Sequence, residues 1–217
     1  MKTKKTVWIP AIIAAAVAAV LLAYYYYMSL SHGGGEVRPH VPSGGAEGFR
    51  PHRGEGPGGS GEIFKTLGTI AVFLGAASFT WFWFKKRRNS RSMLVRKAGK
   101  LFYAVHKLLG WTTLIAIAVH GIYFLITKSG DNKIYTGLAG FVILLAISGY
   151  GLFIPRIRNK WMRTVHRSLG LLWVPVLILH AGGSAIAAIV ANLAVCVLVQ
   201  FLEKRAERSE EPIPENR

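Results

Sequence analysis

The sequence predicts an all-α integral membrane protein, a six-transmembrane-helix bundle with both termini in the cytoplasm. Of its 217 residues, 52% are hydrophobic and only 17% are charged, whereas soluble domains carry about a quarter charged residues. The apolar residues form uninterrupted runs, and a spanning helix needs roughly 20 of them. Six runs qualify, and they are Val7–Leu30, Ile63–Phe84, Leu101–Thr127, Ile134–Ile154, Val165–Ala181 and Ser184–Leu202.

The first run, Val7–Leu30, has two interpretations. Lys2, Lys4 and Lys5 precede an Ala-rich stretch, a pattern that also resembles a signal peptide. The run is longer than a signal peptide requires, however, and it ends in Tyr24–Tyr27, aromatic residues of the kind that anchor helices at the membrane interface. These two features favour a helix that is retained.

The stretch Ser31–Gly61 is rich in Gly and Pro and has almost no large apolar side chains. This composition predicts a flexible extracytoplasmic loop, so residues 1–62 comprise one helix and this loop. The loop contains His32, His40 and His52, which together with nearby glutamates form a candidate metal site. Solvated histidines are the alternative, because nothing fixes their spacing.

Residues 63–202 supply the other five spans, and residues 203–217 form a charged cytoplasmic tail. Gly182–Gly183 divide the last two spans, and the fifth span also contains Pro175. One continuous helix of their combined length would overshoot a bilayer, so the glycines predict a helical hairpin.

Positive charge predicts the orientation. Nineteen Lys and Arg residues lie in the terminal segments and in the connections after the second and fourth spans, against six on the opposite side. Lys and Arg mark cytoplasmic segments, so both termini are expected inside, in the plasma membrane. The net charge of +17 would suggest a nucleic-acid partner in a soluble protein. Because the charge sits in clusters between apolar runs, no nucleic-acid partner is expected here.

Four histidines lie inside the predicted spans, His106 and His120 in the third and His166 and His180 in the fifth. Ionisable groups are rare within a bilayer and face the bundle interior. Thirteen residues separate the members of each pair. Fourteen helical steps rise about 21 Å and return to within about 40° of the starting direction. Each helix therefore presents two imidazoles on one face, one near each membrane surface.

The third and fifth spans are separated by one crossing and run parallel, which puts His106 level with His166 and His120 level with His180. Two imidazoles that face each other across a bundle can hold a haem iron from both sides, so we expect two stacked haems. Packing of satisfied histidines and a proton relay are the alternatives. The single cysteine, Cys196, excludes a disulfide framework and cysteine-ligated metal centres.

The two histidine segments align without a gap, as AVHKLLGWTTLIAIAVHG and TVHRSLGLLWVPVLILHAG. Each first histidine is followed by a basic residue, Lys107 or Arg167, and by Gly110 or Gly170 four residues on. Glycine on that face would let a flat macrocycle lie against the backbone, although close helix packing is an alternative use. Lys107 and Arg167, with Arg163 nearby, lie near the cytoplasmic surface, where they can hold haem propionates or lipid headgroups. The fourth span adds glycines of the same possible use at Gly137, Gly140, Gly149 and Gly151.

Trp173 lies seven residues from His166 and seven from His180. Seven steps return to within about 20° of the ligand face, so its ring should project between the two cofactors, opposite Thr113. There it either offers an electronic route or packs an otherwise empty core. The Thr113 hydroxyl is a candidate acceptor for the indole N–H, although threonine also bonds its own helix.

Six spans with His106/His120 on the third and His166/His180 on the fifth resemble the ferric-reductase-like transmembrane domain. That domain occurs in iron and copper reductases, NADPH oxidases and the haem subunit of the bacterial methionine sulfoxide reductase system. The resemblance covers roughly residues 63–202. It implies two haem b groups and electron transfer from the cytoplasm to the outer side. Complete reductases of the family add a flavin and nicotinamide domain, whereas this chain ends in EKRAERSEEPIPENR and has no G-x-G-x-x-G loop.

The missing domain predicts an oxidoreductase component that needs a separate electron donor, which is a cytoplasmic flavoprotein, a bound flavin or a quinol. The candidate acceptors are ferric iron, dioxygen and an extracytoplasmic partner reductase. The basic stretch Lys85–Lys100 is a candidate docking surface for an acidic flavoprotein, although topology alone also explains it. The alternative of another class is a non-redox membrane transporter or assembly factor whose histidines relay protons or bind metal.

Overall fold

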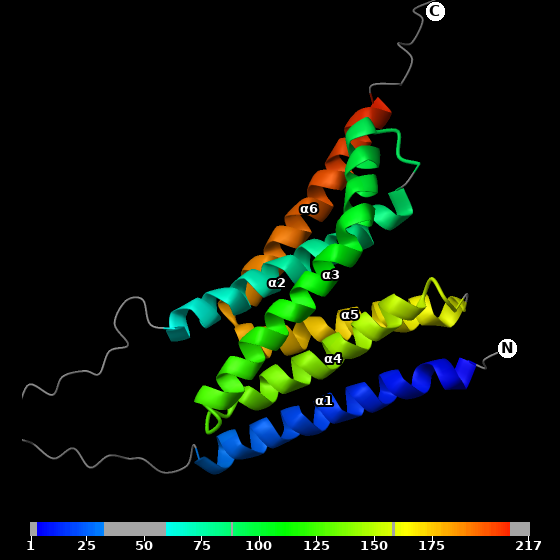
Figure 1. Ribbon diagram of the computed structural model, residues 1–217. Coiled ribbons are helices and arrows are strands. Elements are labelled where there is room, and N and C mark those ends of the chain that lie inside the picture. Colours follow the sequence, from blue (N-terminus) through cyan, green and yellow to red (C-terminus); the bar gives the residue numbers. More distant parts are fainter. Residues whose placement is uncertain (1–3, 33–59, 88, 158, 209–217) are drawn as a thin grey trace, which may run out of the picture.

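The computed structural model describes residues 4–32, 60–87, 89–157 and 159–208, and this part of the chain is entirely helical. The elements, in chain order, are α1 (Lys4–His32), α2 (Ser60–Phe84), the short 3-10 helix η1 (Lys85–Arg87), α3 (Met93–Thr127), α4 (Lys133–Phe153), α5 (Lys160–Ala181) and α6 (Gly183–Arg208) (Figure 1). All six α-helices are long and apolar enough to cross a membrane. The predicted six-helix architecture is therefore confirmed. The predicted loop histidines His40 and His52 lie outside the described residues.

The surface of the bundle is apolar. Val20, Leu30 and Ile126 expose 68%, 79% and 76% of their surface, and similar side chains cover every α-helix. Soluble monomers rarely expose apolar patches of this extent, because each exposed apolar side chain forfeits the free energy of leaving water. This surface suits the hydrocarbon of a lipid bilayer and makes the chain a multi-pass membrane protein.

The helices form two groups of three. One buried cluster joins α1, α4 and α5, with Ile143 and Val165 at its centre, both fully buried. A second cluster joins α2, α3 and α6 through Phe84, Val95 and Val199. Figure 1 shows the two groups fanning apart toward the end at which α3 begins. The groups therefore meet mainly near the opposite end, where short turns link α3 to α4 and α5 to α6.

Helix α1 is an integral part of the first group. Its small residues Ala11 and Ala18 are 4% and 3% exposed against α4 and α5, because a stripe of alanines lets two helix backbones approach closely. The Tyr150 hydroxyl on α4 donates to the Val7 carbonyl, and the Tyr24 ring meets the edge of Tyr135 with 4.7 Å between centroids. The sequence analysis assigned this helix to a separate segment, and nothing in the composition of the first span indicated the packing.

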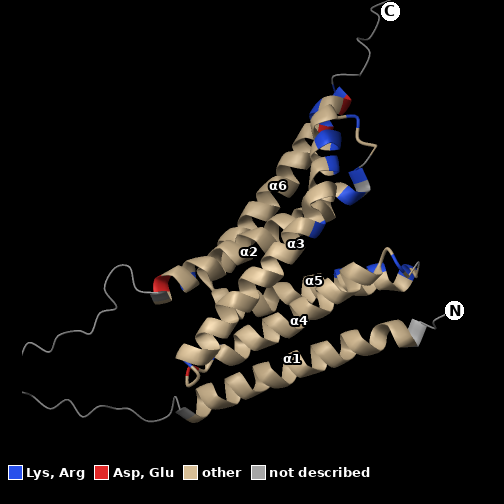
Figure 2. Ribbon diagram, viewed as in Figure 1, with Lys and Arg blue, Asp and Glu red and all other residues tan. Residues whose placement is uncertain are grey.

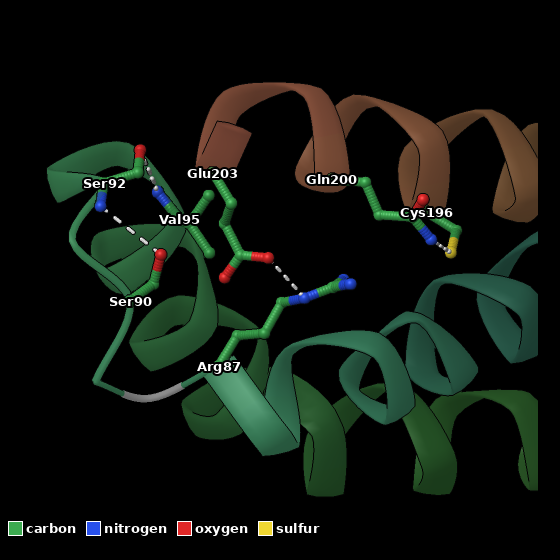
Figure 3. A network of polar contacts seen from close by, with 7 residues as sticks. All are labelled: Arg87, Ser90, Ser92, Val95, Cys196, Gln200 and Glu203. Carbon is green, nitrogen blue, oxygen red and sulfur yellow. Dashed lines mark hydrogen bonds and ion pairs between the residues drawn. The ribbon is translucent and has the colours of Figure 1, made fainter. Parts of the chain in front are cut away.

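Two helices extend beyond their predicted limits. Helix α3 begins at Met93, eight residues before the predicted start, because the Ser92 hydroxyl accepts a bond from the Val95 N–H at 3.5 Å and caps the first turn (Figure 3). Helix α6 continues past Leu202, where the Arg87 Nε–Glu203 Oε2 ion pair, 2.6 Å long, fastens it to η1 (Figure 3). The first six residues of the predicted tail are thus helical.

The break between the last two helices is the one that the glycine pair predicts. Helix α5 ends at Ala181 and α6 begins at Gly183, with Gly182 at φ = 53°. Residues with a Cβ rarely adopt this left-handed conformation, so glycine suits the position. The Gly182 N–H still donates to the Ile178 carbonyl, at 3.0 Å, which closes the last turn of α5.

Lys and Arg side chains gather at one end of the bundle, where α2 ends, α3 and α5 begin, and α6 ends (Figure 2). We call this the basic end. It carries Lys85, Arg87 and Arg163 among others, whereas the far end carries few charges of either sign (Figure 2). The asymmetry in the sequence is therefore preserved as an asymmetry in space.

The link between α6 and α2 generates a prediction on stability. The Asn192 side-chain amide donates to the Ala76 carbonyl at 2.8 Å, and the Thr80 hydroxyl donates to Asn192 Oδ1 at 3.2 Å. Replacing Asn192→Leu should lower the free energy of unfolding by about 1 kcal/mol, the usual size of interhelical hydrogen bonds in lipid. Thermal unfolding in detergent measures the change. Gln200→Leu is the control, because the Gln200 amide donates only within α6, to Cys196 Sγ. An equal loss of stability in both variants would contradict the role of Asn192.

Candidate functional site

Two pairs of imidazoles face each other between α3 and α5. The His106 and His166 ring centroids are 6.2 Å apart with an interplanar angle of 79°. The His120 and His180 centroids are 6.3 Å apart at 87°. The structure thus brings together the histidines that the sequence paired. The two pairs are nearly identical in spacing although they lie fourteen residues apart along each helix.

The backbones of α3 and α5 do not touch. In the described part of the chain, no Cα atom of α3 lies within 8 Å of a Cα atom of α5. Helix α3 packs instead on α2, and α5 packs on α4. The four imidazoles therefore extend into the space between two helix pairs, and each ring can be held from the side by the neighbouring helix.

Helix α2 holds both histidines of α3. His106 Nδ1 lies 2.9 Å from the Ser78 carbonyl oxygen and 3.0 Å from the Ser78 hydroxyl. His120 Nδ1 lies 2.7 Å from the Phe64 carbonyl oxygen. A carbonyl oxygen can only accept, so in both rings Nδ1 carries the proton and donates it. The orientation of each ring is fixed by a bond that leaves Nε2 out.

Helix α4 holds both histidines of α5 in the same way. His166 Nδ1 donates to the Ile147 carbonyl at 2.9 Å. His180 Nδ1 lies 3.0 Å from the Thr136 hydroxyl, which itself donates to the Lys133 carbonyl at 2.7 Å. Because that hydroxyl proton is already used, the hydroxyl accepts from His180. Among the described residues, none donates to or accepts from Nε2 of any of the four rings, so four neutral imidazoles each keep a free lone pair.

These acceptors reveal an internal repeat. Phe64 and Ser78 on α2 are fourteen residues apart, and so are Lys133 and Ile147 on α4, where the Lys133 carbonyl is reached through Thr136. The α2–α3 pair and the α4–α5 pair are therefore two copies of one arrangement. The sequence analysis found the likeness of the two histidine helices but missed the likeness of their supporting helices. A fourteen-residue spacing of carbonyl groups leaves no mark in the side chains.

Glycines on the supporting helices give the rings room. A Cβ at Gly68 would lie 2.6 Å from His120 Cε1, one at Gly137 would lie 2.9 Å from His180 Cε1, and one at Gly151 would lie 3.3 Å from His166 Cε1. Gly137 and Gly151 were expected to admit a flat macrocycle, and here they admit an imidazole instead. The sequence analysis did not single out Gly68.

The glycines beside the histidines on α3 and α5 have open surroundings. The closest atom to a Cβ at Gly110 would be Ser78 Oγ, and at Gly170 it would be Phe79 Cε2, each 4.0 Å away. The two positions therefore leave space on the histidine face of their helices. On α4, a Cβ at Gly149 meets nothing within 4 Å, and one at Gly140 lies 3.7 Å from Val176 Cγ1.

Trp173 occupies the middle of the bundle, seven residues from each histidine of α5 and only 8% exposed. Its indole Nε1 donates to the Gly140 carbonyl at 2.9 Å. A Cβ at Gly75 would lie 3.0 Å from the Trp173 ring and 3.4 Å from Thr113 Cγ2, so the ring reaches the neighbourhood of α2 and α3. The Thr113 hydroxyl donates to Leu109 on its own helix, at 2.7 Å, and thus does not serve the indole.

The basic residues singled out in the sequence are exposed at the basic end, namely Lys107, Arg163 and Arg167. A fourth cation, Lys85, approaches two of them from the end of α2. Burial lowers the pKa of the Lys85 ammonium below its usual value, and the charges of Arg167 and Arg163 lower it further. Sequence spacing could not place Lys85 in this group, because it belongs to a different helix pair.

The donor set limits the metal chemistry. No group of three or more His, Cys, Asp or Glu side chains suited to a metal ion occurs among the described residues. Each pair therefore offers two ligands, and a zinc ion held by protein side chains alone needs three or four. Two ligands on opposite sides suit a metal that brings its own equatorial ligands.

Comparison of the chain with known protein families, with curated proteins and with solved structures found no match. The functional argument therefore depends on the residues and geometry described above.

The glycine support generates a prediction on ring placement. Gly68→Ala puts a methyl group against the His120 ring, which its 2.7 Å bond to Phe64 holds in place. Such overpacking usually lowers the free energy of unfolding by about 1–3 kcal/mol, measurable as a lower Tm in detergent. Gly121→Ala is the matched control, because a Cβ there meets nothing within 4 Å and alanine favours a helix. A Gly68→Ala protein as stable as the control would show that the ring is not confined.

Proposed function

We propose that this protein transfers electrons across the membrane through two haem b groups, one held by His106 and His166 and the other by His120 and His180. The observation that carries the proposal is the spacing of the paired imidazoles. A metal ion bonds an imidazole nitrogen at about 2.0–2.1 Å, and that nitrogen lies about 1.2 Å from its ring centre, so two rings on opposite sides of one ion have centroids about 6.4 Å apart. The paired centroids here are 6.2 and 6.3 Å apart.

The hydrogen bonds of the rings support the same proposal. A histidine that binds metal nearly always donates its other N–H to a carbonyl or similar acceptor, which fixes the tautomer and the ring orientation. All four Nδ1 atoms have such an acceptor. Histidines that served packing alone would leave four Nε2 atoms without partners inside the bilayer, which is costly where no water can replace the lost bonds.

Each haem iron, when bound, would supply a one-electron carrier. The protein's own residues hold the ligands: α3 and α5 present the imidazoles, and α2 and α4 orient them. Gly110 and Gly170 leave space for the macrocycles, and Trp173 fills the core between the two sites. Lys107 and Arg167, and with them Lys85 and Arg163, offer positive charge for propionate groups at the basic end.

The direction follows from the charge asymmetry. The basic end carries most of the Lys and Arg residues (Figure 2), so we place it, with both termini, on the cytoplasmic side of the plasma membrane. Electrons would enter from a cytoplasmic flavoprotein or a quinol and leave to ferric iron, dioxygen or an extracytoplasmic partner reductase. On this proposal the chain is an oxidoreductase component related to the ferric-reductase-like family.

Removing single histidines tests the cofactor assignment. His106→Ala and His166→Ala should each lose one of the two haems and keep the other, because each haem would lose an axial ligand while the distant pair is untouched. The haem-to-protein ratio and the reduced α band of the purified protein measure the loss. His120→Ala and His180→Ala are reciprocal controls that should lose the other haem. A colourless wild-type protein would refute the proposal and favour a transporter or assembly factor.

Trp173 tests the route between the sites. If the aromatic ring conducts, Trp173→Phe should transfer electrons between the haems near the wild-type rate, whereas Trp173→Leu should slow the transfer severalfold. Flash photoreduction followed by absorbance measures the rate, and unchanged haem content in both variants is the control. Equal rates in the two variants would leave Trp173 a packing residue, with its bond to Gly140 as its main contribution.

A further inference from the structure

A cavity of about 310 Å³ lies between α2, α5 and α6, apart from the space between the imidazole pairs. Its walls are almost entirely apolar and include Gly75 and Phe79 of α2, Leu177 of α5 and Ala188 of α6. Trp173 forms part of the wall, so one indole ring separates the cavity from the middle of the candidate site. A volume of this order is at the lower end of those that bind small organic ligands, about 300–1,000 Å³.

The polar groups in this wall are few, and two of the three are already paired. The Trp173 N–H donates to Gly140, and the Asn192 amide bonds Ala76 and Thr80. The third is the Trp83 N–H. It is buried and has no hydrogen-bond partner among the described residues. A buried indole N–H without an acceptor is unfavourable, and tryptophan normally finds one, so the cavity offers one unused donor.

The unused donor lies near the histidine site. Trp83 follows Ser78 by five residues on α2, a rise of about 7.5 Å, and the Ser78 carbonyl is the acceptor that holds His106. The donor therefore lies toward the basic end, at the depth of the His106–His166 pair. The apolar remainder of the cavity runs along α2 toward Val72 in the middle of the bundle.

We propose that this cavity binds the head group of a membrane quinol or quinone, with a ring oxygen accepting the Trp83 N–H and the apolar ring lying against Trp173 and Phe79. The choice of a quinone among apolar molecules with an acceptor oxygen rests on the proposed function, which needs an electron donor. A quinone partitions into the bilayer, carries acceptor oxygens on a flat apolar ring and is a two-electron carrier. It would reach the cavity from the lipid without crossing the basic end.

Photolabelling of the full-length protein in lipid nanodiscs tests the site. The probe is an azido-naphthoquinone, with menadione as competitor, and mass spectrometry maps the label. We expect the label on cavity residues of α2 or α6, displaced by menadione. Trp83→Phe removes the donor but keeps the ring, and it should weaken the competition by menadione roughly five- to tenfold, as loss of one hydrogen bond does. Ala188→Phe fills the cavity and should abolish specific labelling.

Trp8→Phe is the matched control. The Trp8 N–H is likewise buried without a partner, but it borders a separate cavity of about 140 Å³ between α1 and α5. Competition by menadione should be unchanged in this variant. Label scattered over lipid-facing residues, or equal weakening in Trp8→Phe and Trp83→Phe, would overturn the proposal.

Haem content, measured separately in each protein, keeps the two proposals apart. A red protein whose label menadione fails to displace overturns the quinone site and leaves the haem proposal standing. A colourless protein that carries a displaceable label in the cavity supports the site and refutes the haem proposal.

Discussion

The hydrogen bonds from four imidazole Nδ1 atoms to acceptors on α2 and α4 are the interactions on which the centre of this bundle depends. They hold rings from α3 and α5 at 6.2 and 6.3 Å although the two helix backbones stay apart. Three of the acceptors are backbone carbonyls, and the fourth is a hydroxyl that is itself bonded to a carbonyl. A helix carbonyl can accept a second bond without losing its first, so the rings are oriented at no cost to the helices.

The same requirement explains the composition of α2 and α4. An imidazole that bonds the backbone of a neighbouring helix must lie close to it, and Gly68 and Gly137 supply the close approach. The repeat of this device on two helix pairs gives the centre an approximate internal symmetry. Helices α1 and α6 lie outside the repeat, and they differ accordingly: α1 packs along α4 through alanines, whereas α6 borders a cavity against α2 and α5.

Charge and polarity are distributed to match this arrangement. Polar side chains within the helices are mostly bonded to the backbone of their own or the next helix, as Thr113, Thr136 and Asn192 are. Cations are excluded from the centre and gather at one end, where Lys85 from one helix group meets Arg163 and Arg167 from the other. Like charges at that end repel each other, so the two groups of helices gain little by closing together there, and an anionic group between them would be favoured.

The sequence by itself determined the number of helices, the break at Gly182, and the pairing of His106 with His166 and of His120 with His180. Apolar run length and helical periodicity are local properties, and local properties are legible in one chain. Only the tertiary structure decided which atoms hold the rings, that α1 joins the core, that Gly137 and Gly151 face imidazoles, and that Trp173 bonds Gly140 rather than Thr113. These features depend on the approach of backbone atoms on different helices, and backbone carbonyls are the same at every position of the sequence.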